Sequence, residues 1–177
     1  CVMCGYHLGA SREPITDDHL VSQTSDAIRR LNPSVYPSIV FTSNGSFLDH
    51  AEVSDEIRPV LLRMLREAGF RFLVTETRPE FITPSRLDAM IEGFVPTPRS
   101  VEGRYPISIS FGLESSNDVV QQYCVNKGRR LKDYLIAFDM LRRKNLHYDC
   151  YVLLGKLFMT AREDVEDAIA TIKLAVD

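Results

Sequence analysis

The segment FRFLVTETRPE, residues 70–80, shows the pattern that recurs along most of the chain. Its first six residues form a short apolar run of strand length, and the charged side chains of Glu76 and Arg78 follow directly. A helical pattern precedes the run at about residues 54–68, with apolar side chains on one stripe and Gly69 just past its end. The segment therefore predicts a helix, a buried strand and a polar loop, in that order.

Three further apolar runs of strand length lie elsewhere in the chain, at residues 37–42, 107–112 and 148–154. Helical patterns follow or separate the four runs, at about residues 54–68, 84–92, 117–125 and 132–144. A last helix is predicted from Thr160, because its hydroxyl and the Glu163 carboxylate fit a capping box. The predicted order is βαβαβαβα.

Strand-helix units of this length imply parallel strands joined by right-handed crossovers, and both a doubly wound sheet and a (β/α) barrel satisfy that order. A complete eight-unit barrel needs roughly 250 residues, so four strands in 177 residues favour a partial or open barrel. We interpret residues 1–177 as one domain. The chain begins at Cys1 and its last helical pattern reaches Asp177 without a capping signal, so we expect both ends to belong to a longer protein.

The charge of the chain narrows the range of functions. The formal net charge is −3 at pH 7, which argues against a general nucleic-acid binder, because such proteins depend on many Lys and Arg contacts to phosphate. Basic residues cluster at 127–130 and 142–144, and the second cluster falls at a predicted helix end, where cations favour the macrodipole. No apolar segment approaches the roughly 20 residues of a membrane span. We therefore expect a cytoplasmic protein with no membrane association.

Polar or small residues follow each predicted strand, at 42–49, 75–80, 112–118 and 155–156. Because parallel strands end at the same edge of a sheet, we expect these residues to lie along one edge. Each group also has a purely structural interpretation: residues 43–46 as a turn, Glu76 and Arg78 as an ion pair, and Glu114 as a helix cap. The proline-rich connection at residues 94–106 is either functional or a surface insertion.

Cys1 and Cys4 form the only close pair among four cysteines, so the spacing does not indicate a disulfide framework. A C-x-x-C pair suits a zinc knuckle, a redox dithiol or part of an iron-sulfur ligand set. His7 could add a zinc ligand, but no second C-x-x-C or paired histidine lies at a suitable spacing. Cys124 falls in a predicted helix and Cys150 in a predicted strand, where both are expected to be ordinary buried side chains.

The cysteine pair and the predicted fold together resemble the radical S-adenosylmethionine (SAM) superfamily. The cluster loop of that superfamily, C-x-x-x-C-x-x-C, follows the first strand of a partial (β/α)6 barrel, and Cys1 and Cys4 match its last two cysteines. The resemblance implies that the first strand and the first cluster cysteine precede Cys1 in the parent protein. It also implies a 4Fe-4S cluster with one iron open to SAM, and it places Met3 near the adenine.

Further motifs carry this resemblance along the chain. Ser43-Asn44-Gly45-Ser46 is similar to the glycine-rich motif that holds the SAM amino group, and Glu114 and Lys127 match positions of ribose and carboxylate contacts. The TRPE motif at residues 77–80 resembles Elongator-catalytic-subunit-like radical SAM domains. TSNGSFLD, ETRPEFIT and GLESSNDVVQQYCVNKG resemble the radical SAM subunit family of archaeosine synthases. Glu76 and Arg78 are candidates for substrate contact or for support of this edge.

The resemblance implies an enzyme that generates a 5'-deoxyadenosyl radical and, in that subgroup, cleaves a carbon-nitrogen bond of a lysine-bearing deazaguanine in tRNA. It implies tRNA contacts outside this segment, a partner subunit and an external electron donor. Two positions depart from the pattern of that subgroup: Tyr151 stands where some relatives have an acidic ribose contact, and residues 155–158 lack the prolines of the archaeosine enzymes. Both departures bear on the identity of the substrate more than on that of the cofactor. The alternatives are methylthiolation, Elongator-like or small-molecule chemistry with the same cofactor, or a non-enzymatic zinc or cluster-binding interaction domain.

Overall fold

The structure is a computed structural model that describes residues 4–11, 13, 15–95 and 103–176. Its central feature is a sheet of four parallel strands in the order β1-β2-β3-β4. The strands are β1 (Ser38–Val40), β2 (Phe72–Glu76), β3 (Ile107–Glu114) and β4 (His147–Val152). The predicted α/β class and the parallel strands are confirmed. The described strands form an open sheet, and the structure does not show a closed barrel.

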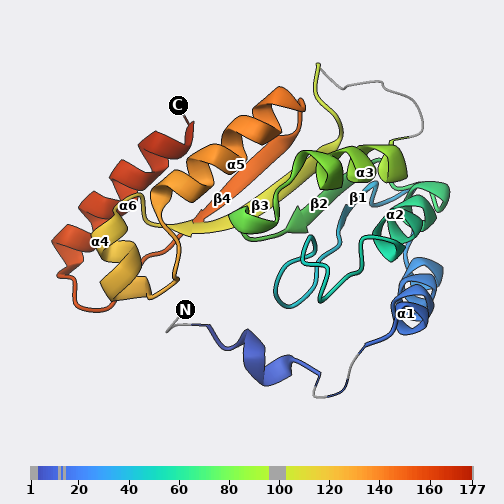
Figure 1. The fold of residues 1–177 in the computed structure, drawn as a ribbon, viewed down its shortest axis with the longest axis horizontal. Helices are drawn as coiled ribbons and strands as arrows, with labels where there is room; N and C mark the ends of the chain where they lie inside the picture. The colour runs from blue at the N-terminus through green and yellow to red at the C-terminus, as the bar shows by residue number, and fades with distance from the viewer. Residues whose placement is uncertain (1–3, 12, 14, 96–102, 177) are drawn as a thin grey trace.

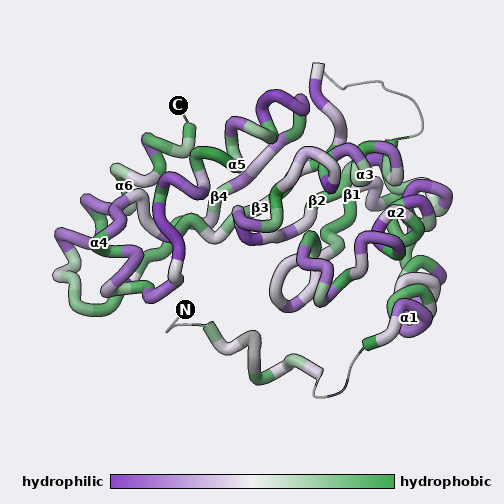
Figure 2. Tube along the Cα trace, viewed as in Figure 1, coloured by the Kyte–Doolittle hydropathy of each residue, from purple (hydrophilic) through white to green (hydrophobic). Residues whose placement is uncertain are grey.

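The helices are α1 (Asp17–Arg30), α2 (Ile57–Glu67), α3 (Pro84–Phe94), α4 (Asp118–Val120), α5 (Leu131–Arg143) and α6 (Ala161–Val176), with 3-10 turns at Tyr6–Gly9 and Pro79–Phe81. Of these, α2, α3 and α5 lie in the connections between sequential strands and cover one face of the sheet (Figure 1). Crossovers of one hand between sequential parallel strands place the connecting helices on the same face. Figure 2 shows hydrophobic and hydrophilic stretches alternating along these helices, as expected where one side is buried. Among the helices described, none combines the length and apolar character that crossing a membrane requires.

The core lies between the covered face of the sheet and helices α2, α3 and α5. Ile107, Ile109 and Phe111 of β3 alternate along the strand and are fully buried in this core. The helices contribute Leu61, Leu62, Leu65, Leu87, Met90, Tyr134, Phe138 and Leu141. The intervening residues Ser108 and Ser110 face the opposite side of the sheet. The sheet therefore has one apolar, covered face, whereas its other face is mixed, with Val40, Phe72 and Val74 on the same side as these two serines.

Two elements differ from the prediction. Helix α1 lies ahead of β1, where we predicted no helix, although Leu20, Val21, Thr24, Ala27 and Ile28 recur at helical spacing and the Thr16 side chain caps its start. The helix predicted at residues 117–125 is instead the short α4 followed by a π-helical turn, Gln121–Val125. The turn places the buried Gln121 amide against the end of β3, where its Nε2 donates to the carbonyl oxygens of Leu113 and, at 2.8 Å, Ser115.

The predicted helix starts at Thr83 and Thr160 are confirmed. The Thr83 hydroxyl accepts a hydrogen bond from the Arg86 N–H at 3.3 Å. The Glu163 carboxylate accepts from the Thr160 N–H at 2.8 Å, and the Thr160 hydroxyl accepts from the Glu163 N–H at 3.3 Å, which completes the capping box. Most of the proline-rich connection predicted at residues 94–106 lies outside the described residues.

Candidate functional site at the carboxyl edge of the sheet

The carboxyl ends of the strands bring the predicted polar residues to one edge of the sheet. Residues 43–46 follow β1, Glu76 is the last residue of β2, and Glu114 is the last residue of β3. All four strands run in the same direction, so these groups lie at the same edge. The predicted co-location along one edge is confirmed for these residues.

The turn at residues 43–46 is held by a carboxylate that the sequence analysis did not identify. The two Glu52 carboxylate oxygens accept hydrogen bonds from the backbone N–H groups of Gly45 and Ser46, each at 3.1 Å. A side chain at Gly45 would overlap the Glu52 carboxylate, so a glycine is needed at this position for the close approach. Glu52 lies seven residues from Gly45, and no local sequence signal marks the contact.

Arg58 fixes the rest of the loop between β1 and α2. Its side chain is 1% exposed and donates to the carbonyl oxygens of Phe47 at 3.0 Å and Val53 at 2.6 Å. It also pairs with Asp55 at 2.5 Å, and this hydrogen bond is the main cause that lowers the pKa of the Asp55 carboxyl. The available sequence signal was a charged residue on the otherwise apolar stripe of α2. Arg58 therefore holds the loop between β1 and α2 through its contacts with Phe47, Val53 and Asp55.

The loop is also joined to the end of β2. The Ser46 hydroxyl accepts a hydrogen bond from the Arg78 N–H at 3.1 Å, and the Phe47 N–H donates to the Glu76 carbonyl oxygen at 2.9 Å. The loop after β1 and the TRPE segment after β2 are therefore parts of one hydrogen-bonded structure.

A cavity of about 890 Å³ connects this turn with the amino-terminal segment. Its lining includes Cys4, Ser43, Asn44 and Gly45, together with apolar side chains of α1. The Asn44 side chain donates to the carbonyl oxygen of Gly9 at 3.3 Å, which ties the two segments together. The Ser43 hydroxyl is buried without a hydrogen-bond partner among the described residues. Two predicted site residues, Cys1 and Met3, lie outside the described residues.

Glu114 and Lys127 form a largely buried ion pair. The Lys127 Nζ lies 3.1 Å from Glu114 Oε1 and also donates to the carbonyl oxygen of Gly112, and the two side chains are 10% and 12% exposed. Glu114 has a positive φ of 64°, a left-handed conformation that is strained for a residue with a side chain. The helix-cap interpretation of Glu114 is wrong, because the Asn117 side chain caps α4.

Glu76 and Arg78 do not pair with each other. Glu76 Oε1 accepts a hydrogen bond from the Tyr151 hydroxyl at 2.7 Å, and this bond is the main cause that raises the pKa of Tyr151. Arg78 instead pairs with Glu80 at 3.1 Å, and Arg129 pairs with the same carboxylate at 2.5 Å. The interpretation of Glu76 and Arg78 as an ion pair is therefore wrong, and Tyr151 is an additional polar residue of this edge.

Most of the basic residues that cluster in the sequence contact other residues of the chain. Lys127 and Arg129 contact Glu114 and Glu80, as described above. In the second cluster, Arg142 donates to the Tyr148 hydroxyl at 2.7 Å, Arg143 pairs with Asp139 at 2.8 Å, and Lys144 pairs with Asp88 at 2.5 Å. These contacts favour the structural interpretation of the cluster at the end of α5.

The loop after β4 is anchored by a buried lysine. The Lys156 ammonium group lies 2.7 Å from Asp164 and 3.3 Å from Asp167, and it donates to the Leu153 carbonyl oxygen at 2.6 Å. Its side chain is fully buried. The hydrogen bond from Lys156 is the main cause that lowers the pKa of the Asp164 carboxyl. Lys156 therefore has a structural role here.

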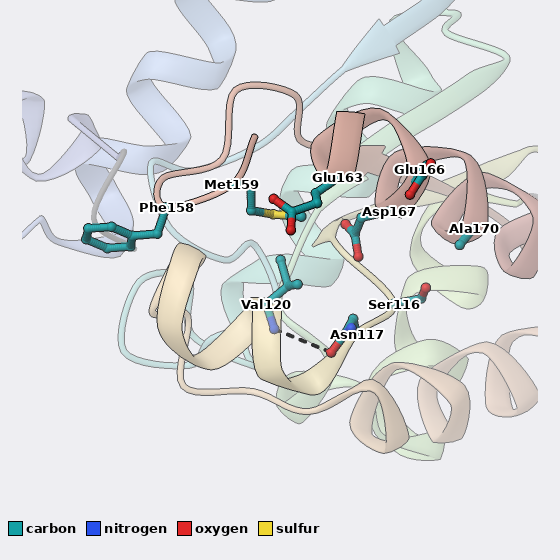
Figure 3. Close-up of a pocket in the computed structure, with 9 residues that line it drawn as sticks. All are labelled: Ser116, Asn117, Val120, Phe158, Met159, Glu163, Glu166, Asp167 and Ala170. Atoms are coloured by element: carbon teal, nitrogen blue, oxygen red, sulfur yellow. Dashed lines mark hydrogen bonds between the residues drawn. The ribbon is translucent and has the colours of Figure 1, made fainter. Parts of the chain in front are cut away.

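A second hollow of about 640 Å³ lies between α4 and α6. The loop after β3 supplies Ser116 and Asn117, and α6 supplies Glu163 and Asp167, which point into the hollow in Figure 3. Of the predicted site residues that the structure describes, none lines this hollow. It is therefore distinct from the cavity that contains Cys4.

The cysteines differ in their surroundings. Cys4 is exposed, whereas Cys124 and Cys150 are partly buried, and burial raises the pKa of the Cys150 thiol to about 11. Within the described part of the chain, no group of three His, Cys, Asp or Glu side chains is placed to hold a metal ion. Cys1 is not among the residues searched, so the proposed cluster ligands are not tested by this finding.

Comparisons with known proteins identify similar archaeal chains. The chain is 29% identical to archaeosine synthase subunit beta of Methanosarcina acetivorans over 173 residues, which are 97% of this chain and 48% of that protein. It is 29% identical to archaeosine synthase subunit beta of Thermococcus kodakarensis over 171 residues, 95% of this chain and 50% of that protein. An uncharacterised protein of Methanocaldococcus jannaschii is 28% identical over 183 residues, 100% of this chain and 47% of that protein. No protein-family model matches the chain.

These matches extend over nearly the whole of the present chain. The chain itself spans about half the length of the curated relatives it matches. The similarity thus covers the sheet, its helices and the carboxyl edge described above.

Proposed function

We propose that the chain is the core of a radical SAM enzyme that modifies a tRNA nucleoside. The observation that carries the proposal is the shared cavity of Cys4 and residues 43–45, at the edge that also includes Glu114. In such an enzyme the cysteine thiolate would hold the cluster, and the turn at residues 43–45 would hold the amino acid part of SAM. These two contacts would have to be neighbours, because SAM would bind to the open iron of the cluster. We further propose that the four-stranded sheet is part of a (β/α)6 barrel in the parent protein.

The residues present fit a 4Fe-4S cluster and SAM. Cys4 is exposed and lines the cavity, so its thiolate is available as a ligand, with Cys1 and an upstream cysteine completing the proposed set. The buried Ser43 hydroxyl without a partner is a polar atom that a ligand in the cavity would satisfy. When bound, the two groups would together supply a 5'-deoxyadenosyl radical that abstracts a hydrogen atom from the substrate.

The residues of the chain would bind and orient SAM. Because Glu52 already occupies the N–H groups of Gly45 and Ser46, the turn offers carbonyl oxygens and a nearby negative charge, and both favour the ammonium group of SAM. Glu114 would accept hydrogen bonds from ribose hydroxyls, and Lys127 would donate to the carboxylate. In the structure these two side chains pair with each other. The SAM carboxylate would therefore either replace Glu114 as the partner of Lys127 or bind to Lys127 beside it.

The names of two relatives support a more specific reaction. Both are archaeosine synthase subunits, which favours archaeosine formation in tRNA over the alternative radical SAM chemistries. We propose cleavage of a carbon-nitrogen bond in a lysine-bearing deazaguanine, with a partner subunit, an external electron donor and tRNA contacts outside this segment. The pairing of Lys127, Arg129, Arg143 and Lys144 with carboxylates is consistent with tRNA contacts elsewhere.

The proposal is tested with the full-length parent protein under anaerobic conditions. After cluster reconstitution, incubation with SAM and dithionite is expected to yield 5'-deoxyadenosine, measured by chromatography. No 5'-deoxyadenosine from protein with a complete cluster would contradict the proposal. Anaerobically purified protein that contains zinc and no iron would favour the non-enzymatic interaction domain instead.

A further inference from the structure

The Asn44-Gly45 pair in the turn after β1 contains two groups that can react with each other. Asn44 is the one asparagine of the sequence that a glycine follows. In such a pair the glycine nitrogen can attack the side-chain carbonyl carbon of the asparagine, because glycine has no side chain to hinder the approach. Both residues are exposed and line the cavity that contains Cys4. Water therefore reaches a pair whose spontaneous reaction needs no other reagent.

The reaction of this pair is deamidation, and it balances without an oxidant or a reductant. The Gly45 nitrogen gives up its proton and forms a bond to Asn44 Cγ. The bond from Cγ to Nδ2 breaks, and the Nδ2 group leaves as ammonia with that proton. One water molecule then opens the resulting succinimide ring at either of its carbonyl groups. The product is aspartate or isoaspartate, so a neutral amide becomes a carboxylate.

The Glu52 carboxylate opposes the first step of this reaction. One of its oxygens accepts a hydrogen bond from the Gly45 N–H at 3.1 Å, which holds the proton that has to leave. The negative charge beside this group also disfavours the amide anion that attacks. The other oxygen accepts from the Ser46 N–H at 3.1 Å, and the carboxylate fills the space next to the Gly45 Cα atom. Glu52 therefore restrains both the proton and the backbone of the attacking residue.

The Asn44 side chain is restrained by a separate contact. Its Nδ2 donates to the carbonyl oxygen of Gly9 at 3.3 Å, in a segment 35 residues earlier in the chain. Ring closure requires this side chain to bend back toward its own main chain, so the contact with Gly9 has to break. The two reacting groups are thus each held by another part of the fold, and neither restraint is a property of the Asn-Gly sequence itself.

We propose that Asn44 is a deamidation site and that Glu52 is the residue that protects it. Conversion would place a new carboxylate next to the Gly45 contact with Glu52, where two like charges would loosen the turn at residues 43–46. This inference goes beyond the proposed function and does not depend on it, because no step involves iron, SAM or tRNA.

The experiment follows Asn44 in the full-length protein, incubated at pH 8 and sampled over time. Peptide mass spectrometry measures the mass gain at Asn44, and Asn145, which Leu146 follows, is the internal reference. Glu52→Ala is expected to raise the rate of conversion at least about fivefold over wild type. Glu52→Gln keeps an acceptor oxygen without the charge and is expected to raise the rate by a smaller factor. Glu56→Ala is the matched control with the wild-type rate, because Glu56 is exposed at the start of α2.

The same measurement in concentrated urea shows whether the effect comes from the fold. Unfolding removes the contacts of Glu52 and Gly9, so wild type and all three variants are expected to convert Asn44 at one rate, at least about fivefold faster than folded wild type. Circular dichroism confirms that the variants are folded without urea, and Glu52→Gln alone decides if Glu52→Ala does not fold. A Glu52 variant that converts as slowly as folded wild type, or more slowly, would overturn the inference. Folded wild type that converts as fast as the unfolded protein would also overturn it.

Discussion

Gly112 shows how a single missing side chain organises the candidate site. A Cβ atom there would overlap Lys127 Nζ and lie 2.5 Å from Glu114 Oε1. The Gly112 carbonyl oxygen also accepts a hydrogen bond from the Tyr134 hydroxyl at 3.0 Å, and burial, with the Glu114 charge, raises the pKa of that phenol. The glycine therefore allows an ion pair to pack directly against the end of β3.

Gly112→Ala is expected to displace the Lys127 and Glu114 side chains and to lower the free energy of unfolding by about 1–3 kcal/mol, the usual cost of overpacking a tight site. The free energy of unfolding from urea titration checks this. Gly9→Ala is the control, because the nearest atom to its added Cβ, Asn44 Nδ2, lies at 3.8 Å. Equal stability of Gly112→Ala and wild type would contradict the close contact.

The thiols provide a second test at the scale of single residues. Burial raises the pKa of Cys150 to about 11, so very little of it is thiolate near neutral pH, whereas Cys4 is exposed. In metal-free, reduced protein at pH 8, iodoacetamide is expected to label Cys150 at least about tenfold more slowly than Cys4. Peptide mass spectrometry over time measures both rates, and comparable rates would show that Cys150 is accessible as a thiolate.

At the scale of elements, helix starts were predictable and some helix positions were not. Thr83 and Thr160 carry side-chain signals that fix where α3 and α6 begin. Helix α1 was missed although its sequence carries the signals: Leu20, Val21, Ala27 and Ile28 form an apolar stripe, and Thr16 at its start and Arg29 and Arg30 at its end are ordinary end signals. The π-helical turn after α4 depends on how Gln121 packs against β3, and a single sequence carries no signal for that contact.

Thr160→Ala is expected to destabilise the protein by about 1 kcal/mol, because α6 loses a capping hydroxyl. Thr160→Ser keeps the hydroxyl and is expected to cost no more than a few tenths of a kcal/mol, at the low end of the capping range. Both changes in the free energy of unfolding are measured from the shift of the urea unfolding midpoint, with the slope of free energy against urea concentration unchanged. Two variants of equal stability would show that the capping box contributes little.

The anchor of the loop before α6 predicts a pH dependence. The pKa of Asp164 is lowered by its hydrogen bonds with Lys156 and Gly155, so its contribution to stability is present above the pKa of an unfolded Asp, about 3.9, and is lost as pH falls through the lower folded value. Asp164→Asn is expected to reduce the melting temperature at pH 7, and the difference from wild type should shrink toward pH 3. Asp26→Asn is the control, because Asp26 lies on the exposed side of α1 and pairs only with the exposed Arg29 among the described residues. A difference that stays constant with pH would exclude the Asp164 carboxylate as its source.

At the scale of the whole molecule, the sequence predicted the α/β fold class and the carboxyl edge of the sheet, but it did not predict which side chains contact one another there. Apolar runs and helix stripes indicated the four parallel strands and the edge shared by residues 43–46, Glu76 and Glu114. Partners such as Glu52 for Gly45, or Tyr151 for Glu76, depend on loop conformation and strand register, which spacing along the chain does not determine. The barrel, the cluster and SAM stay predictions.

The central claim is that Cys4 is a ligand of an iron-sulfur cluster beside residues 43–45. The most direct measurement is the iron and acid-labile sulfide content of the anaerobically reconstituted full-length protein, compared between Cys4→Ser and Cys124→Ser. The account predicts about four iron atoms per chain in wild type and Cys124→Ser and a loss of most of that iron in Cys4→Ser. Full iron and sulfide content in Cys4→Ser would contradict it.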